Sequence, residues 1–202
     1  MTAMTIEAAH GAVVPHEGAA HHEEEHDRAG MNRLGLLLFM ASETMLFLAM
    51  AAARFYISGT AKPEALNIGL GLVLTAILLA SSFAGYRGVG AITKGNRRGF
   101  ITWIGIAALL GVVFIGGVAI EWTGAATEFP PSTPYGTAFY AMTGLHVFHL
   151  LQGLLGLSLL LWLGTRGHFG PDDHWGATAV VRFWTFVDIM WLAVVFPVLY
   201  LL

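Results

Sequence analysis

Residues 99–120 read GFITWIGIAALLGVVFIGGVAI, and none of them carries a charge. An apolar run of about 18 or more residues is typical of a helix that crosses a membrane, because a hydrocarbon layer about 30 Å thick takes about 20 residues to span. Comparable runs occur at about residues 33–55, 67–89, 137–163 and 179–202. The pattern predicts an all-α, polytopic membrane helical bundle with five transmembrane helices.

The composition excludes a soluble domain and several kinds of chemistry. Of the 202 residues, 56% are hydrophobic and only 11% are charged, whereas a soluble domain carries about 25% charged residues. The chain has no cysteine, which excludes disulfides, thiolate metal sites and attached c-type haem. It also shows no phosphate-binding loop and no dinucleotide-binding glycine pattern, and its basic residues form no nucleic-acid patch. We therefore expect one membrane domain over residues 33–202.

Glycine is abundant inside the apolar runs rather than only between them. The chain has 25 glycines. In lipid, helices associate through close van der Waals packing, and small residues let their backbones approach one another. The glycines therefore predict close contacts between the helices.

Residues 1–32 differ in character from the rest of the chain. Six of the 13 acidic residues lie before residue 28, and five of the nine histidines accompany them. The segment lacks the apolar core of a signal peptide. Because it has little apolar surface to bury, we interpret it as a polar, disordered N-terminal tail and not as a metal site.

The positions of lysine and arginine predict the orientation. Eight of the ten basic residues lie in the tail and in the second and fourth loops, whereas Arg54 and Lys62 lie on the opposite side. Positive residues concentrate on the cytoplasmic side of membrane proteins. We therefore expect the N-terminus in the cytoplasm and the C-terminus outside.

Four ionisable residues fall well inside the predicted spans: Glu43, His146, His149 and Asp188. A charge at the centre of a membrane helix costs about 2.5–3.5 kcal/mol on the mildest scale, so such a group should face protein and have a partner. His146 and His149 are three residues apart and share a helical face. The predicted topology brings all four to overlapping depths, which favours an intramembrane polar cluster. Helix-joining hydrogen bonds, a proton-linked role and metal or haem ligation all remain open.

Four stretches of the sequence resemble subunit III of the haem-copper oxidases. Residues 38–47 (LFMASETMLF) are similar to its Leu-Phe-x-x-Ser-Glu-x-Met-x-Phe helix, and residues 74–82 (LTAILLASS) to the next helix. Residues 135–149 (YGTAFYAMTGLHVFH) and 183–192 (FWTFVDIMWL) resemble its paired-histidine block and its terminal Phe-Val-Asp-x-x-Trp-Leu block. The stretches occur in the family's order.

The resemblance implies a non-catalytic subunit of a bacterial haem-copper terminal oxidase in the aerobic respiratory chain. Such a subunit has no catalytic, cofactor-binding or metal-binding residues of its own, and haem and copper belong to subunits I and II. It packs directly on subunit I in the bacterial inner (plasma) membrane, binds phospholipid, stabilises the catalytic subunit and supports proton uptake. The family's carbodiimide-reactive carboxylate corresponds to Glu43, and its histidine pair to His146 and His149.

The chain departs from the family pattern in two ways. Longer members have seven helices and hold lipid in a cleft between the first two helices and the others, whereas this chain resembles the five-helix bacterial forms. Thr185 stands where the family's last block has a histidine, which removes one proton-accepting group near Asp188.

The sequence leaves other functions open. The same fold could serve as an accessory membrane subunit of a nitric-oxide reductase, because the redox chemistry would again lie in partner chains. A small proton-linked transporter using Glu43 and Asp188 belongs to a different class, although no interrupted span or inverted repeat supports it. A haem-anchoring subunit would need histidines on separate helices, and both intramembrane histidines lie on one.

Overall fold

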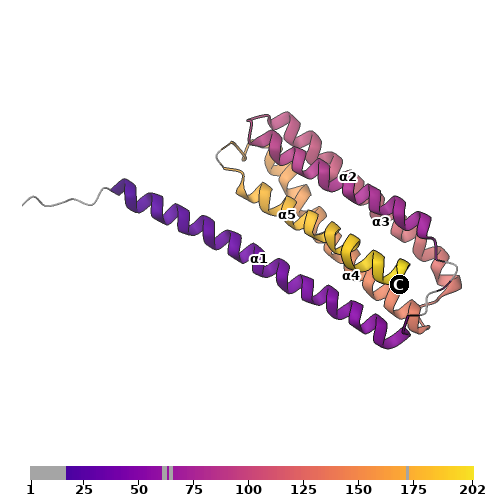
Figure 1. Ribbon diagram of the computed structural model, residues 1–202. Helices are drawn as coiled ribbons and strands as arrows, with labels where there is room; N and C mark the ends of the chain where they lie inside the picture. Colours follow the sequence, from indigo (N-terminus) through magenta and orange to yellow (C-terminus); the bar gives the residue numbers. More distant parts are fainter. Residues whose placement is uncertain (1–16, 61–62, 64–65, 172) are drawn as a thin grey trace, which may run out of the picture. The chain divides into compact units, whose positions relative to one another are not determined.

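The computed structural model describes residues 17–60, 63, 66–171 and 173–202. Within these residues the only regular elements are the helices α1 (Glu17–Ser58), α2 (Ile68–Ile92), α3 (Arg97–Glu128), α4 (Pro134–Thr165) and α5 (Trp175–Met190), and two π-helical segments, Trp191–Val195 and Pro197–Leu201, that continue α5 (Figure 1). Five helices in this described part are long and apolar enough to cross a membrane, with α5 and its π-helical continuation forming one span. The all-α prediction with five membrane-spanning helices is confirmed.

The helix α1 begins at Glu17, within the segment that was predicted to be a polar, disordered tail. Alanine and glutamate are frequent from Glu17 onward, and both are good helix formers. The apolar part of α1 begins near Gly30, close to the predicted start of the first span at Arg33. Residues 1–16 lie outside the described residues, and the division of the chain at residue 32 remains a prediction.

Side-chain caps set where three helices begin. Asn67 accepts a hydrogen bond from the Leu70 amide at 2.9 Å, and Asn96 accepts one from the Gly99 amide at 2.9 Å. Thr133 caps α4 in the same way, with Pro134 in its first turn. Such caps satisfy amides that have no partner inside the helix. Helices α3 and α4 therefore extend beyond the predicted spans 99–120 and 137–163, because hydropathy marks the lipid-embedded part and not the helix ends.

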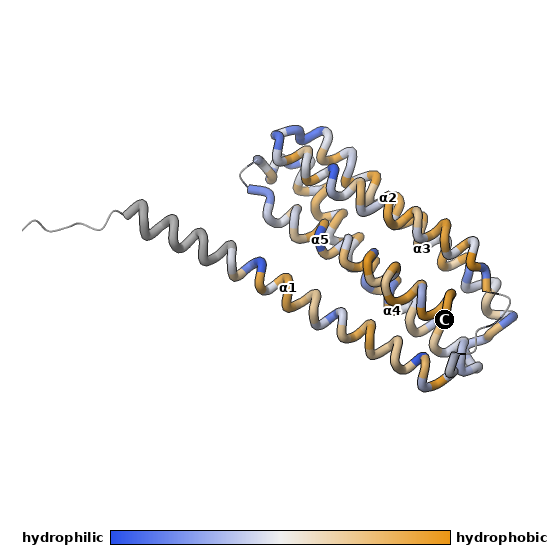
Figure 2. Tube along the Cα trace, in the orientation of Figure 1, coloured by the Kyte–Doolittle hydropathy of each residue, from blue (hydrophilic) through white to orange (hydrophobic). Residues whose placement is uncertain are grey.

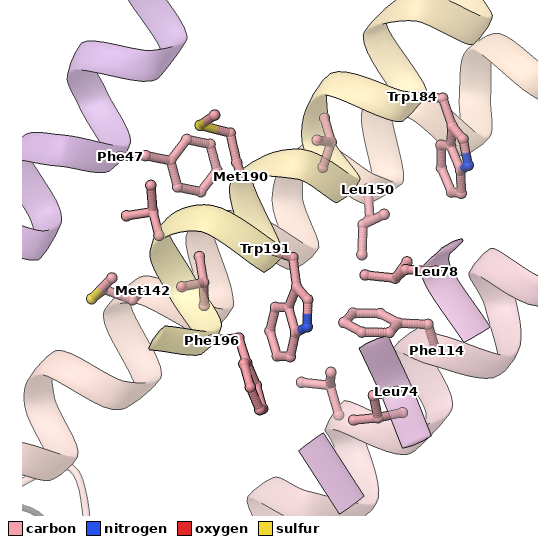
Figure 3. Packing of buried hydrophobic residues seen from close by; sticks show 14 of the residues in the cluster. Phe47, Leu74, Leu78, Phe114, Met142, Leu150, Trp184, Met190, Trp191 and Phe196 are labelled. Atoms are coloured by element: carbon pink, nitrogen blue, oxygen red, sulfur yellow. The ribbon is translucent and has the colours of Figure 1, made fainter. Parts of the chain in front are cut away.

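The last span departs from a regular α-helix after Met190. Two π-helical segments follow, and the Leu202 amide donates to the Pro197 carbonyl at 3.0 Å, five residues back. Proline has no amide hydrogen, so it interrupts the regular α-helical pattern. In the wider helix the rings of Trp191 and Phe196 both face the core (Figure 3).

The chain divides into two units, Met1–Phe39 and Met40–Leu202, and the packing described here lies within the second. Hydrophobic residues run along α2, α3, α4 and α5, and hydrophilic residues gather at the turns (Figure 2). Helix α2 packs on α3 and α5, and α4 packs on α3 and α5.

Trp184 of α5 fills the centre of this packing and is fully buried. A Cβ added to Gly111 would lie 2.5 Å from Trp184 Cη2, and one added to Gly153 would lie 2.5 Å from Cε3. The indole N–H donates to Ser81 Oγ at 2.9 Å, and that hydroxyl donates to the Ala107 carbonyl at 2.9 Å. The predicted role of glycine in close helix contacts is confirmed at these two positions.

We expect Gly153→Ala to destabilise the protein by about 1–3 kcal/mol, because the new methyl group overlaps the Trp184 ring and the core has no room to move aside. The control is Gly144→Ala in the same helix, where the nearest atom to the added Cβ is Trp122 Cη2 at 3.8 Å. Thermal unfolding in detergent would measure both variants. Equal midpoints for the two alanine variants would contradict the close fit of Trp184.

Candidate functional site

Glu43 of α1 and His149 of α4 form a direct pair inside the membrane-spanning region. His149 Nε2 lies 2.8 Å from Glu43 Oε2, and the two side chains are 3% and 20% exposed. The other ring nitrogen, Nδ1, lies 2.8 Å from the Leu145 carbonyl oxygen. A carbonyl oxygen only accepts, so Nδ1 must carry a hydrogen and donate it.

This geometry leaves one proton between Nε2 and Oε2. If the proton is on His149, the pair is an imidazolium and a carboxylate; if it is on Glu43, both groups are neutral. The net charge of the pair is zero in either case. The pair can therefore stay in a low-dielectric layer at a smaller cost than a lone charge, and its proton can move without changing the total charge.

The contact surface of α1 is a narrow seam. Glu43, Phe47, Ala51 and Arg54 recur at three- and four-residue spacing and so lie on one helical face. Phe47 and Arg54 are fully buried, and Ala51 is 7% exposed. The Phe47 ring lies 5.0 Å from the His149 ring between centroids. The seam places Glu43 beside α4. A shift of α1 by one helical turn along α4 would separate Glu43 from His149.

His146 lies in an aromatic box and not in the carboxylate pair. Its ring is fully buried, with centroids 5.0 Å from Trp191, 5.6 Å from Phe114 and 6.3 Å from Phe47. Neither ring nitrogen has a hydrogen-bond partner in the described part of the chain. The helical face shared with His149 therefore does not give the two histidines the same partners.

Asp188 of α5 faces α2. Its Oδ2 accepts a hydrogen bond from Ser82 Oγ at 2.6 Å, while Oδ1 is buried and has no partner among the described residues. Thr185 is one turn away, and its hydroxyl oxygen is also buried without a partner there. The four predicted residues thus do not share one hydrogen-bonded cluster: the structure joins Glu43 to His149 and Asp188 to Ser82.

Several polar contacts were not predicted from the sequence. Glu121 follows the predicted span 99–120 directly, but it lies within α3, is 8% exposed and accepts a hydrogen bond from the Tyr200 hydroxyl at 2.7 Å. Arg54, at the end of the predicted first span, is fully buried in α1 and donates to the Gly59 carbonyl. Thr75 accepts the Trp191 indole N–H at 2.9 Å. The sequence signal that could have indicated hydrogen bonds of Thr75, Ser81 and Ser82 to other helices is that these hydroxyl residues lie inside apolar runs.

The described residues contain no group of three or more histidine, aspartate or glutamate side chains placed to hold a metal ion. What the site can do is hold and shift a proton within the Glu43–His149 pair and join helices by hydrogen bonds. Its role stays a prediction on this geometry alone.

Comparison with known proteins identifies the family. The family model described as cytochrome c oxidase subunit III matches residues 2–201. Cytochrome c oxidase subunit 3 of Thermostichus vulcanus is 32% identical over 186 residues, covering 89% of this chain and 92% of that protein. The probable cytochrome c oxidase subunit 3 of Nocardia farcinica is 33% identical over 82% of this chain and 86% of that protein, and the corresponding protein of Mycobacterium leprae is 33% identical over 86% and 89%.

These matches cover all five apolar helices and the Glu43–His149 pair, and they do not favour a nitric-oxide reductase subunit or a transporter. A multi-pass chain of this family works in a complex with other oxidase subunits. The chain belongs to the cytochrome c oxidase subunit III family and is the subunit III of an oxidase.

Proposed function

We propose that this subunit stabilises the catalytic subunit of a bacterial terminal oxidase and supports its proton uptake, without a redox centre of its own. It would bind subunit I directly, in a complex that also contains subunit II, in the bacterial plasma membrane. Haem and copper would belong to those partners. The positive residues of the tail and of the α2–α3 and α4–α5 turns support a cytoplasmic N-terminus and an outside C-terminus.

The Glu43–His149 pair is the observation that carries the proton-linked part of the proposal. A purely structural tie between α1 and α4 would need only a neutral hydrogen bond, whereas this pair holds a proton that either member can carry. The Glu43 side chain is 20% exposed, whereas that of His149 is 3% exposed.

The unpaired polar atoms near the centre support the same proposal. Both His146 nitrogens, Asp188 Oδ1 and Thr185 Oγ1 are buried without hydrogen-bond partners in the described part of the chain. Leaving such atoms unpaired costs about 1–3 kcal/mol each, and native proteins rarely keep them without a functional reason. Simple helix joining would not need them.

The structural part of the proposal rests on the apolar surface of α1. Between Met40 and Ser58 most of this helix is exposed, including Met45 at 66%, Leu48 at 47% and Phe55 at 36%. In the membrane such a surface contacts lipid or another subunit, so it does not carry the free-energy cost of exposing apolar atoms to water. Packing of a partner along apolar helices therefore requires no rearrangement of the core.

Mild-detergent purification through this subunit should recover a larger many-helix protein that carries the complex's haem and copper. When the subunit is then removed, the metals should stay with the partner, as measured by absorption spectra and elemental analysis of the two fractions. Recovery of this chain alone from membranes, or stoichiometric metal in its fraction, would contradict the proposal.

Glu43→Gln should leave assembly intact, because the glutamine amide can donate to neutral His149 Nε2. Glu43→Leu should weaken the complex by about 1–3 kcal/mol, since it leaves that nitrogen unpaired. If the shared proton supports uptake, the Gln variant should assemble normally yet lose activity faster during turnover. Thermal midpoints and turnover lifetimes would measure both effects.

Glu128→Leu is the control, because Glu128 is exposed at the end of α3, and it should match the wild type. Identical stability and turnover lifetime for wild type, Glu43→Gln and Glu43→Leu would show that the pair neither joins the helices nor supports proton uptake.

Replacement by leucine should have different effects on stability at His149 and at His146. His149→Leu should destabilise the complex by about 1–3 kcal/mol, because it leaves the Glu43 carboxyl without its partner. His146→Leu should not destabilise the complex, since it replaces two buried nitrogens that have no hydrogen-bond partner among the described residues with apolar atoms. Thermal unfolding of the two variants would compare them. A larger loss for His146→Leu would show that its nitrogens have partners that the described chain does not supply.

A further inference from the structure

One face of α4 is exposed along the middle of the helix. We call it the α4 exposed face, and its members recur at the three- and four-residue spacing of a single helical face: Phe148, Leu151, Gln152, Leu155, Ser158 and Leu159. Leu155 is 73% exposed and Phe148 is 56% exposed, and Gln152 and Ser158 are exposed as well. Exposed apolar residues are expected where a helix meets lipid, whereas exposed polar residues there are costly.

Gln152 lies near the middle of the membrane. It is eighteen residues after Pro134 and thirteen residues before Thr165 in α4, so the helix extends about 27 Å beyond it in one direction and about 20 Å in the other. The hydrocarbon layer is about 30 Å thick. A glutamine side chain spans only a few ångströms, so its amide cannot reach water or lipid headgroups from this depth.

The amide of Gln152 has no hydrogen-bond partner in the described part of the chain. A glutamine amide offers two N–H donors and one carbonyl acceptor, and neither this amide nor the Ser158 hydroxyl bonds a described residue. Exposed hydroxyls of α3 behave differently, since Thr102 and Thr123 donate to carbonyls of their own helix at 3.0 and 2.7 Å. The α4 exposed face therefore presents polar groups that its own helix does not satisfy.

The part of α1 that precedes Met40 has no polar side chain at this depth. Residues 34–39 are leucine, glycine and phenylalanine. Arg33 lies ten residues before Glu43, about 15 Å along the helix, whereas Gln152 lies only three residues, about 4.5 Å, from His149, the partner of Glu43. Hydrocarbon chains supply no hydrogen bonds either, so the partner of this amide is expected in another protein chain.

We propose that a transmembrane helix of another oxidase subunit packs along the α4 exposed face and presents a polar side chain that hydrogen-bonds the Gln152 amide. This inference rests on the proposed assembly with other subunits, and it names the surface and the group through which one of them is held. Serine, threonine, asparagine, glutamine and histidine form such bonds between membrane helices. The apolar side chains of the face pack around the bond.

Gln152→Met tests the bond in the intact oxidase complex, because methionine is an unbranched side chain of similar length that lacks the amide. If the face met only lipid, this change would remove a polar group from hydrocarbon and would leave the subunit bound as tightly as the wild type. We expect instead that the apparent dissociation constant of the subunit rises about three- to tenfold, because the partner's polar group is left unpaired. Subunit content per haem after dilution in mild detergent measures it.

Leu155→Met is the matched control, because it introduces the same residue on the same face, one turn further along α4, where the side chain is 73% exposed. It exchanges one apolar side chain for another, so its dissociation constant should equal that of the wild type. Equal constants for Gln152→Met, Leu155→Met and the wild type would overturn the proposal.

A photo-crosslinking residue at position 155 identifies the occupant independently of the strength of the bond. It should join this chain to another oxidase subunit. Crosslinks only to lipid, to residues 1–39 of this chain or to a second copy of it would show that the proposed helix is not there. In those outcomes the other subunits still co-purify; if they do not co-purify, the proposed function itself fails.

Discussion

A hydrocarbon environment supplies no hydrogen bonds, so every polar group of this chain in the membrane must find its partner in the protein. The helices meet this requirement for the backbone. Inter-helix contacts meet it for several buried side chains, whereas His146, Thr185 and Asp188 keep atoms that have no partner among the described residues. Trp184 and Trp191 of the last span bond Ser81 and Thr75 of α2. Tyr200 bonds Glu121 of α3. The last span is therefore connected to its neighbours from Trp184 to Tyr200.

Large aromatic rings and small residues together allow these bonds to form. The Trp184 indole reaches Ser81 only because Gly111 and Gly153 leave space for its ring. In the π-helical segment after Met190, the Trp191 indole donates to Thr75. Its ring lies beside that of Phe114 (Figure 3). The fit of the tryptophan rings and their hydrogen bonds thus depend on the same contacts. Together they fix the register of neighbouring helices more strictly than apolar packing alone would.

Helix α1 is attached differently, and the difference bears on function. In Met40–Leu202 it meets α4 through a seam in which Glu43 pairs with His149 and Arg54 lies over the Tyr135 ring. A pair that shares one proton at zero net charge can respond to its surroundings while the remaining helices stay packed. The subunit thus combines a tightly packed set of helices with one contact in which two side chains share a proton.

The sequence by itself determined the number of spans, the all-α class, the family resemblance and the identity of the intramembrane ionisable residues, because apolar run length and residue type are local properties. Partners were decided only by the tertiary structure. His146 and His149 share a face and both lie near Phe47, yet only His149 has hydrogen-bond partners among the described residues, and Asp188 is bonded to Ser82 and not to the histidines. The spacing of residues along a helix indicates only roughly the direction in which a side chain points. A hydrogen bond depends on the placement of two helices to within less than an ångström, and packing around rings such as that of Trp184 sets this placement.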